Sequence, residues 1–128
     1  MKATKIIIGI LIILLFVGIG LWGAAKKHTG PGGQVQSGEV SIVLTEEGFS
    51  PKTIRIRKGT TITLTTNVGR FFWPASDLHP SHGIYPAFDP KKPIPAAESW
   101  SFTFDRVGSW DFHDHLSPYY TGTITVIE

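Results

Sequence analysis

Histidine is the residue type best placed to do chemistry in this chain, and four of its five histidines form two close pairs. The first pair is His79 and His82 in DLHPSHG, and the second is His113 and His115 in FHDHL. Residues two apart in a strand point to the same face with α-carbons about 6.5–7 Å apart, so the second pair can converge on one metal ion. Pro80 stiffens the backbone between the rings of the first pair. Together, the two pairs predict a metal site.

The neighbouring alternation predicts which way the second pair points. Trp110 and Phe112 fall on the apolar positions of a strand, so Asp114 is expected on the core side and the two histidines on the opposite face. The alternative for either pair is a set of solvated polar side chains without a ligand. The fifth histidine, His28, is expected to be a solvated linker residue.

Three carboxylates lie near the histidine pairs in sequence. Asp77 and Asp114 are weaker candidates for metal ligands, and Asp77, Asp89 and Asp114 could also accept hydrogen bonds from imidazole N–H groups. Each of them could instead be a turn or capping residue.

Copper is the expected metal and zinc is the alternative. Neutral imidazole suits both, and the affinity order of divalent ions places copper ahead of zinc. The chain of 128 residues has no cysteine, and its only methionine is Met1. This composition excludes disulfides, thiolate zinc sites, iron–sulfur clusters and cysteine nucleophiles, and it leaves no thioether ligand.

The charge distribution argues against a nucleic-acid partner. The formal net charge is +2, but four lysines flank an apolar run near the N-terminus, and residues 39–128 hold eight basic against ten acidic side chains. Because the globular part is mildly acidic, no basic surface of the kind that binds nucleic acids is expected.

The N-terminal region predicts an attachment to a membrane. Residues 6–25 form an uncharged apolar run that would extend about 30 Å as a helix, enough to cross a bilayer. We expect residues 1–27 to be an uncleaved anchor that leaves the domain on the extracytoplasmic side, in the periplasm or at the cell surface; a cleaved signal peptide is the alternative. Residues 28–38 have the composition of a flexible linker, and one domain, 39–128, follows.

Apolar and polar residues alternate with period two along most of the domain. The apolar positions fall in six runs, at 40–44, 54–56, 62–64, 100–104, 110–112 and 124–126. Half-buried strands have this period, and no amphipathic helix interrupts them. We therefore expect an all-β antiparallel sandwich of about six to eight strands.

One long segment breaks the alternation. Residues 70–97 contain six of the nine prolines, five aromatic residues and the first histidine pair. Proline at this density does not sit in central strands, and a loop of this length in a small domain is usually functional or disordered. The aromatic side chains argue against disorder.

The strand sequences resemble those of cupredoxins, the plastocyanin and azurin superfamily. Residues 49–59, FSPKTIRIRKG, are similar to the family's F-x-P-x-x-I-x-I-x-x-G pattern, and GSWDFHDHLSPYYTGTITVIE resembles its last two strands. The resemblance covers residues 39–128 and implies a Greek-key β-sandwich, here preceded by one N-terminal transmembrane helix.

The ligands of a blue-copper cupredoxin are not matched. The family's cysteine ligand falls at Asp114, its later histidine and methionine fall within SPYYT at 117–121, and the region of its first histidine reads FFWP at 71–74. A blue type 1 site is excluded, because such a site requires a thiolate.

The histidine pairs are more similar to those of multicopper oxidase cupredoxin domains. GSWDFHDH resembles their G-x-W-x-x-H-C-H segment, in which the positions matched by His113 and His115 bind copper. HPSH resembles the start of their H-P-x-H-x-H motif, with Ile84 where the third histidine would stand.

Three kinds of function follow from these patterns. The leading hypothesis is a membrane-tethered, extracytoplasmic copper-binding protein with a non-blue site for copper storage, delivery or tolerance, served by a redox or copper-transfer partner protein; electron transfer is less favoured without a thiolate. The second is a small copper enzyme that acts on oxygen species or a small anion, although no general acid or base can be assigned beyond the loosely placed Asp77 and Asp114. The third is a metal-free interaction module whose aromatic loop, 70–97, binds a partner.

Overall fold

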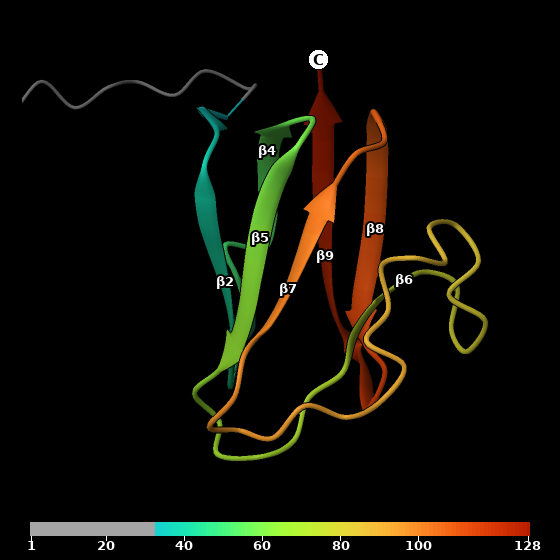
Figure 1. The fold of residues 1–128 in the computed structure, drawn as a ribbon. Helices are drawn as coiled ribbons and strands as arrows, with labels where there is room; N and C mark the ends of the chain where they lie inside the picture. The colour runs from blue at the N-terminus through green and yellow to red at the C-terminus, as the bar shows by residue number, and fades with distance from the viewer. Residues whose placement is uncertain (1–32) are drawn as a thin grey trace, which may run out of the picture.

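The computed structural model describes residues 33–128, which form two β-sheets packed face to face (Figure 1). These residues contain no helix. The strands are β1 (Val35–Gln36), β2 (Glu39–Thr45), β3 (Gly48–Ser50), β4 (Thr53–Arg57), β5 (Thr60–Thr66), β6 (Pro74–Ser76), β7 (Trp100–Phe104), β8 (Gly108–Asp114) and β9 (Ser117–Ile127).

The two sheets are built from strands that are often distant in sequence. One sheet has the order β1-β4-β9-β8-β6 and the other has the order β3-β2-β5-β7. Strand β4 pairs in parallel with β9, and β2 pairs in parallel with β5. Because parallel neighbours need a crossover connection, the chain passes repeatedly from one sheet to the other.

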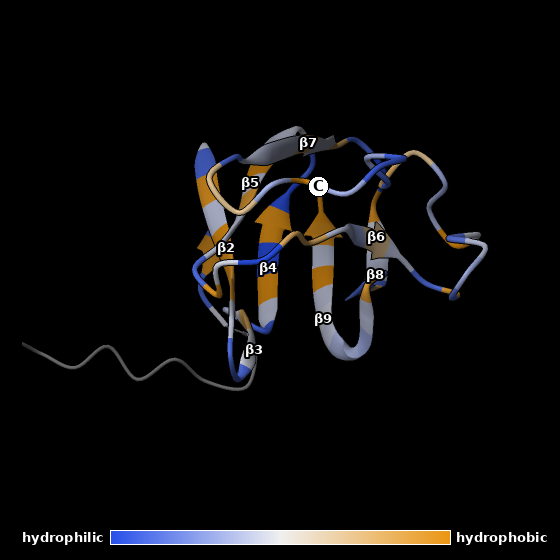
Figure 2. Ribbon diagram, turned by 90° about the horizontal axis from the view of Figure 1, so that it is seen from below, coloured by the Kyte–Doolittle hydropathy of each residue, from blue (hydrophilic) through white to orange (hydrophobic). Residues whose placement is uncertain are grey.

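The core lies between the sheets and follows the period-two pattern. Along β4 and β9 the apolar residues alternate with polar ones, which gives the banding visible in Figure 2. Apolar side chains on the inner faces are buried, among them Ile42, Leu44, Ile56, Ile62, Leu64, Phe104, Phe112 and Ile124. The expected all-β sandwich is confirmed, because alternation places one face of each strand in the core. The expectation that it is antiparallel throughout is wrong, because β1 and β4, β2 and β5, and β4 and β9 pair in parallel.

Residues 33–128 contain nine strands, of which eight lie in the predicted domain 39–128, within the expected six to eight, and β1 lies before it. The six alternating runs correspond to β2, β4, β5, β7, β8 and β9, while β1, β3 and β6 have only two or three residues each. A segment that short shows no period in the sequence. Strand β1 also lies within the expected linker 28–38, where it pairs in parallel with β4.

The long irregular segment folds against the sandwich. Phe72 and Ile94 pair through a β-bridge, and both are buried together with Tyr85 and Phe88. Pro74 begins β6, which lies at the edge of its sheet, where a missing N–H is tolerated. The loop that connects β6 to β7 lies to the right of the sheets in Figure 1 and carries the first histidine pair.

Residues 1–32, and with them the predicted membrane anchor and the first five residues of the predicted linker, lie outside the described residues. In the described part, 33–128, no helix is long and apolar enough to cross a membrane.

Candidate metal centre

The second histidine pair lies where strand β8 ends and turns into β9. His113 is the penultimate residue of β8, and its pairing with Thr121 is followed by a register shift, after which Asp114 pairs with Ser117. Bulges of this kind redirect side chains next to functional sites. His115 occupies the turn that follows, where its backbone N–H donates to the carbonyl oxygen of Trp73 (2.7 Å).

The first pair is held by the loop that leaves β6. The backbone N–H of Asp77 donates to the carbonyl of Asp111 on β8 (2.9 Å), which fastens the start of the loop to the strand that carries His113. His82 has a positive φ of 54°, and its carbonyl accepts a hydrogen bond from the buried hydroxyl of Ser76 (2.8 Å). A left-handed backbone is uncommon for a residue with a side chain and often occurs at functional sites.

All four paired histidines converge. One ring nitrogen from each of His79, His82, His113 and His115 lies within 4.8 Å of the others. Nδ1 of His79 is 3.2 Å from Nε2 of His113, and Nε2 of His82 is 2.9 Å from Nδ1 of His115. His82 and His113 are buried, with 4% and 2% of their surface exposed, whereas His115 is half-buried and His79 is exposed. The interpretation of these histidines as a solvated polar face does not hold for the two buried ones.

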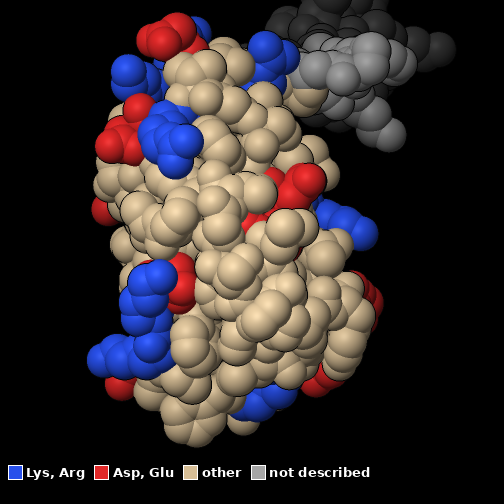
Figure 3. Space-filling model, turned by 90° about the vertical axis from the view of Figure 1, so that its right-hand side faces the viewer, with Lys and Arg blue, Asp and Glu red and all other residues tan. Residues whose placement is uncertain are grey.

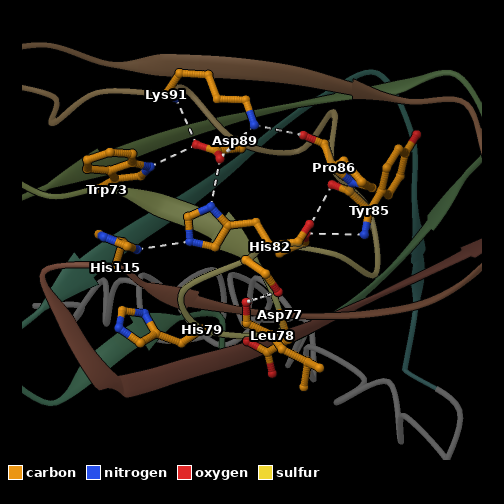
Figure 4. Close-up of polar contacts among 12 residues, drawn as sticks. Trp73, Asp77, Leu78, His79, His82, Tyr85, Pro86, Asp89, Lys91 and His115 are labelled. Carbon is orange, nitrogen blue, oxygen red and sulfur yellow. Dashed lines mark hydrogen bonds and ion pairs between the residues drawn. The ribbon is translucent and has the colours of Figure 1, made fainter.

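Each buried histidine is fixed by a carboxylate behind it. Nδ1–H of His113 donates to Asp77 (2.6 Å), and Nδ1–H of His82 donates to Asp89 (2.6 Å), so in both rings Nε2 faces the cluster. Figure 4 shows His82 between Asp89 and His115. A carboxylate on one ring nitrogen sets the tautomer and makes the other nitrogen a better metal ligand.

Asp89 is itself strongly held. Its carboxylate also accepts hydrogen bonds from the indole Nε1–H of Trp73 (2.8 Å) and from both the backbone N–H and the side-chain ammonium of Lys91 (2.8 and 2.9 Å). Burial by itself raises the pKa of Asp89, but the hydrogen bonds from Lys91, His82 and Trp73 outweigh it and hold the pKa well below its usual value. Asp89 is therefore an anion at neutral pH.

The two peripheral histidines differ from the buried pair. Within residues 33–128, no carboxylate or carbonyl accepts a hydrogen bond from the second ring nitrogen of His79 or of His115. The ring of His115 instead lies against Trp73, with centroids 4.5 Å apart. Burial, helped by the neighbouring imidazoles of His82 and His79, lowers the pKa of His115 and favours its neutral form.

The carboxylate candidates separate into two kinds. Asp77 and Asp89 lie behind the histidines and accept hydrogen bonds from them. Asp114 points away from the cluster, as alternation along β8 predicts, and its buried carboxylate accepts from the backbone N–H of Trp73 (2.7 Å) and from Arg70 (3.0 Å). The four-histidine group does not include Asp114.

The donor set fits a small transition-metal ion. Four nitrogens bound at about 2.0–2.1 Å to one ion lie about 2.8–4.2 Å apart, and the two measured separations, 2.9 and 3.2 Å, fall in that range. The cluster as a whole spans up to 4.8 Å, so its outer rings must draw together slightly for all four to bind one ion. All four donors are imidazoles, which suit copper and zinc better than magnesium or calcium. The chain has no cysteine, so these donors do not include the thiolate of a type 1 copper site.

Sequence reasoning missed the contribution of Trp73, Lys91 and Ser76. The sequence marks Trp73 only as part of the aromatic loop, yet it contacts both Asp89 and His115. No local pattern marks these contacts, because they join residues that the loop brings together. Three of the five aromatic residues of that loop, Phe72, Tyr85 and Phe88, are buried in the core and are not available to a partner.

Comparison with solved structures identifies the class of fold. No protein-family model and no curated protein matches the sequence. A Cu-containing nitrite reductase from Thermus scotoductus is similar with a TM-score of 0.59 and 22% identity, over 70% of this chain and 22% of that one. A purple cupredoxin from Nitrosopumilus maritimus gives 0.56 and 17%, over 69% and 99% of the two chains, and a mutant fern plastocyanin gives 0.55 and 19%, over 69% and 100%.

Residues 33–128 therefore form a cupredoxin-like β-sandwich, as the strand motifs predicted. The chain spans only 22% of the length of the nitrite reductase that it resembles. Within that fold it carries a cluster of four histidines and no cysteine.

Proposed function

We propose that this protein binds copper through His79, His82, His113 and His115 and serves in copper handling outside the cytoplasm. The observation that carries the proposal is the convergence of four imidazole nitrogens within 4.8 Å, two of them oriented by buried or half-buried carboxylates. Copper would supply a redox-active ion with high affinity for nitrogen donors. Zinc is the alternative metal for the same donor set.

Hydrogen bonds within the chain hold the two buried histidines of the proposed site, His82 and His113, in a fixed orientation. Asp77 and Asp89 hold the protons of His113 and His82 on Nδ1, which leaves the Nε2 lone pairs directed at the same point. Trp73 covers His115 and, through its indole N–H, fixes Asp89.

Electron transfer is a second candidate, favoured by the fold and by one contact. Trp73 is half-buried and lies against His115, so an aromatic side chain connects the site to the surface. Reversible cycling of the bound copper in voltammetry would support this role, and loss of the metal on reduction would contradict it.

We also propose that residues 6–25 tether the domain to a membrane with the copper site on the extracytoplasmic side. The support is the length and apolarity of that segment. Membrane fractionation and C-terminal reporter fusions that are active on only one side of the membrane test both the attachment and its orientation.

The decisive test of copper binding is a titration of the full chain with one equivalent of copper(II), followed by electron paramagnetic resonance and thermal unfolding. A site of this kind gives a tetragonal spectrum with nitrogen splitting and stabilises the fold by about 2.7 kcal/mol at a hundredfold excess over the dissociation constant. Both signals should disappear when His113 and His115 are changed to glutamine and persist when His28 is changed to alanine. A wild-type spectrum of aquo copper with no thermal shift, for copper and for zinc, would refute the proposal.

A further inference from the structure

The four histidines of the cluster are of two kinds, and the difference has a functional meaning beyond binding. His82 and His113 are buried, and each is bonded through Nδ1 to a carboxylate. His79 is exposed, and within residues 33–128 its ring has one polar contact, to Nε2 of His113. His115 is intermediate, because its ring is half-buried and its backbone is bonded to Trp73.

The protonation of the ring nitrogens also distinguishes His79 from the buried pair, His82 and His113. With Nδ1–H of His113 donating to Asp77, Nε2 of His113 is the acceptor in its contact with His79, so Nδ1 of His79 carries the proton. For Nδ1 of His79 to bind a metal, that proton must move to Nε2, which has no partner within residues 33–128 to hold it in place. No hydrogen bond within residues 33–128 therefore holds His79 in its metal-binding tautomer, whereas the carboxylates already hold His82 and His113 in theirs.

The side chains around His79 are open to solvent, although the backbone of the turn is held by hydrogen bonds from the N–H groups of His82 and Ile84 to the carbonyls of Leu78 and Asp77. Leu78, His79, Pro80 and Ser81 are all exposed, with 65% of Leu78 accessible, and the chain becomes buried again at His82. The loop after β6 lies at the right of Figure 1 and faces the viewer in Figure 3, where the surface is mostly uncharged and the charged side chains stand mainly toward its margins. An approaching molecule can reach His79 without displacing buried structure.

We propose that His79 is the exchange ligand of this site, through which copper enters and leaves, while His82 and His113 form the permanent base. This inference rests on the proposed copper binding. The exchange partner is a copper carrier that presents a neutral nitrogen ligand of the imidazole class. In the exchange, the bond from copper to His79 breaks as the bond to the incoming nitrogen forms. One neutral nitrogen replaces another, so the oxidation state of the metal does not change.

The test compares His79→Ala with His82→Gln and His113→Gln in the full chain loaded with one equivalent of copper(II). The rate of copper removal by a chromogenic chelator is measured with and without free imidazole. His79→Ala should retain copper but lose it to the chelator about tenfold faster than the wild type or more, and imidazole should restore both the slow rate and the wild-type nitrogen splitting. The two glutamine variants should fail to retain copper, and imidazole should not rescue them because their positions are buried.

Circular dichroism and thermal unfolding of the metal-free variants establish that each is folded. His28→Ala is the matched control and should release copper at the wild-type rate. If the wild type binds copper but His79→Ala and His82→Gln lose it equally, or if His79→Ala releases it at the wild-type rate, the exchange role is overturned and copper binding stands. If the wild type binds no copper, the proposed function fails and this inference fails with it.

Discussion

Replacing Asp89 with asparagine would test how the metal site is organised. Oδ2 of Asp89 accepts from His82 (2.6 Å) and from the Lys91 ammonium (2.9 Å), while Oδ1 accepts from the indole of Trp73 (2.8 Å) and the backbone N–H of Lys91 (2.8 Å). Asparagine keeps the shape but has only one oxygen, so its NH₂ group must face one of these two sets of donors.

The structure determines which side the amide group takes. The indole and backbone N–H groups are fixed in place and can only donate, whereas the Lys91 ammonium, also a donor, sits on an exposed side chain that can turn away, so the asparagine oxygen should remain on the side of the indole and the NH₂ group should face His82. His82 can accept from it only by moving its own proton to Nε2, the nitrogen that faces the cluster. Loss of such an orienting partner costs about 10–100-fold in metal affinity, equivalent to about 1.4–2.8 kcal/mol.

We therefore expect Asp89→Asn to bind copper(II) about 10–100-fold more weakly than the wild type in a competition titration against a chelator of known affinity. The metal-free variant should also be less stable in urea by about 1.5–3 kcal/mol, because it loses a hydrogen bond between charged or strongly polar groups. Asp111→Asn is the matched control, since Asp111 is exposed and accepts from the hydroxyl of Thr123. An Asp89→Asn affinity within about twofold of the wild type would refute the tautomer argument.

Three further predictions concern the surroundings of the site. Asp114→Asn should leave the copper spectrum unchanged but lower the free energy of unfolding in urea by about 1.5–3 kcal/mol. The reason is that Asp114 accepts hydrogen bonds from Trp73 and Arg70 and none from the histidine cluster. A changed copper spectrum would instead indicate that Asp114 is a ligand. Gly122→Ala should lower the free energy of unfolding in urea by about 1–3 kcal/mol or more, because a Cβ there would lie 2.5 Å from the ring of Phe112. Gly33→Ala is the control and should be neutral, because no atom lies within 4 Å of its Cβ position. Equal effects of the two variants would contradict the packing. Burial and the hydrogen bond to Asp105 raise the pKa of Tyr85 above its ordinary value of 10.0. As the pH rises, Tyr85 therefore loses its proton in the unfolded chain before it does so in the folded one. The contribution of Tyr85 to the free energy of unfolding should be complete below pH 10 and should fall as the pH rises above it. Urea unfolding between pH 8 and 11 should show a smaller alkaline loss for Tyr85→Phe than for the wild type or Tyr119→Phe, and identical profiles would disprove the assignment.

The agreement between sequence and fold is greatest where the signal is periodic. Strands β2, β4, β5, β7, β8 and β9 all lie at the alternating runs, because alternation is a direct consequence of burying one face of a strand. The short strands β1, β3 and β6 have no such signal, and β6 exists because its neighbour β8 supplies hydrogen-bond partners at the sheet edge.

The composition and spacing of the histidines are enough to determine the chemistry open to this protein. A chain without cysteine offers imidazole and carboxylate as its metal donors, and the alternation through Phe112 places His113 on the opposite face of its strand from Asp114. Those conclusions depend on residue identity and on local geometry, both of which are encoded within a few neighbouring residues.

The tertiary structure alone decided that the two pairs meet and how each ring is oriented. The contacts of His79 with His113 and of His82 with His115 join residues more than 30 positions apart, across an irregular loop with no period from which its path could be read. Asp77 and Asp89 look no different from Asp114 in the sequence, yet they are the two that hold imidazole protons. The difference between the two buried histidines and the exposed His79 arises from burial and hydrogen bonding, which exist only once the loop is packed against the sheet.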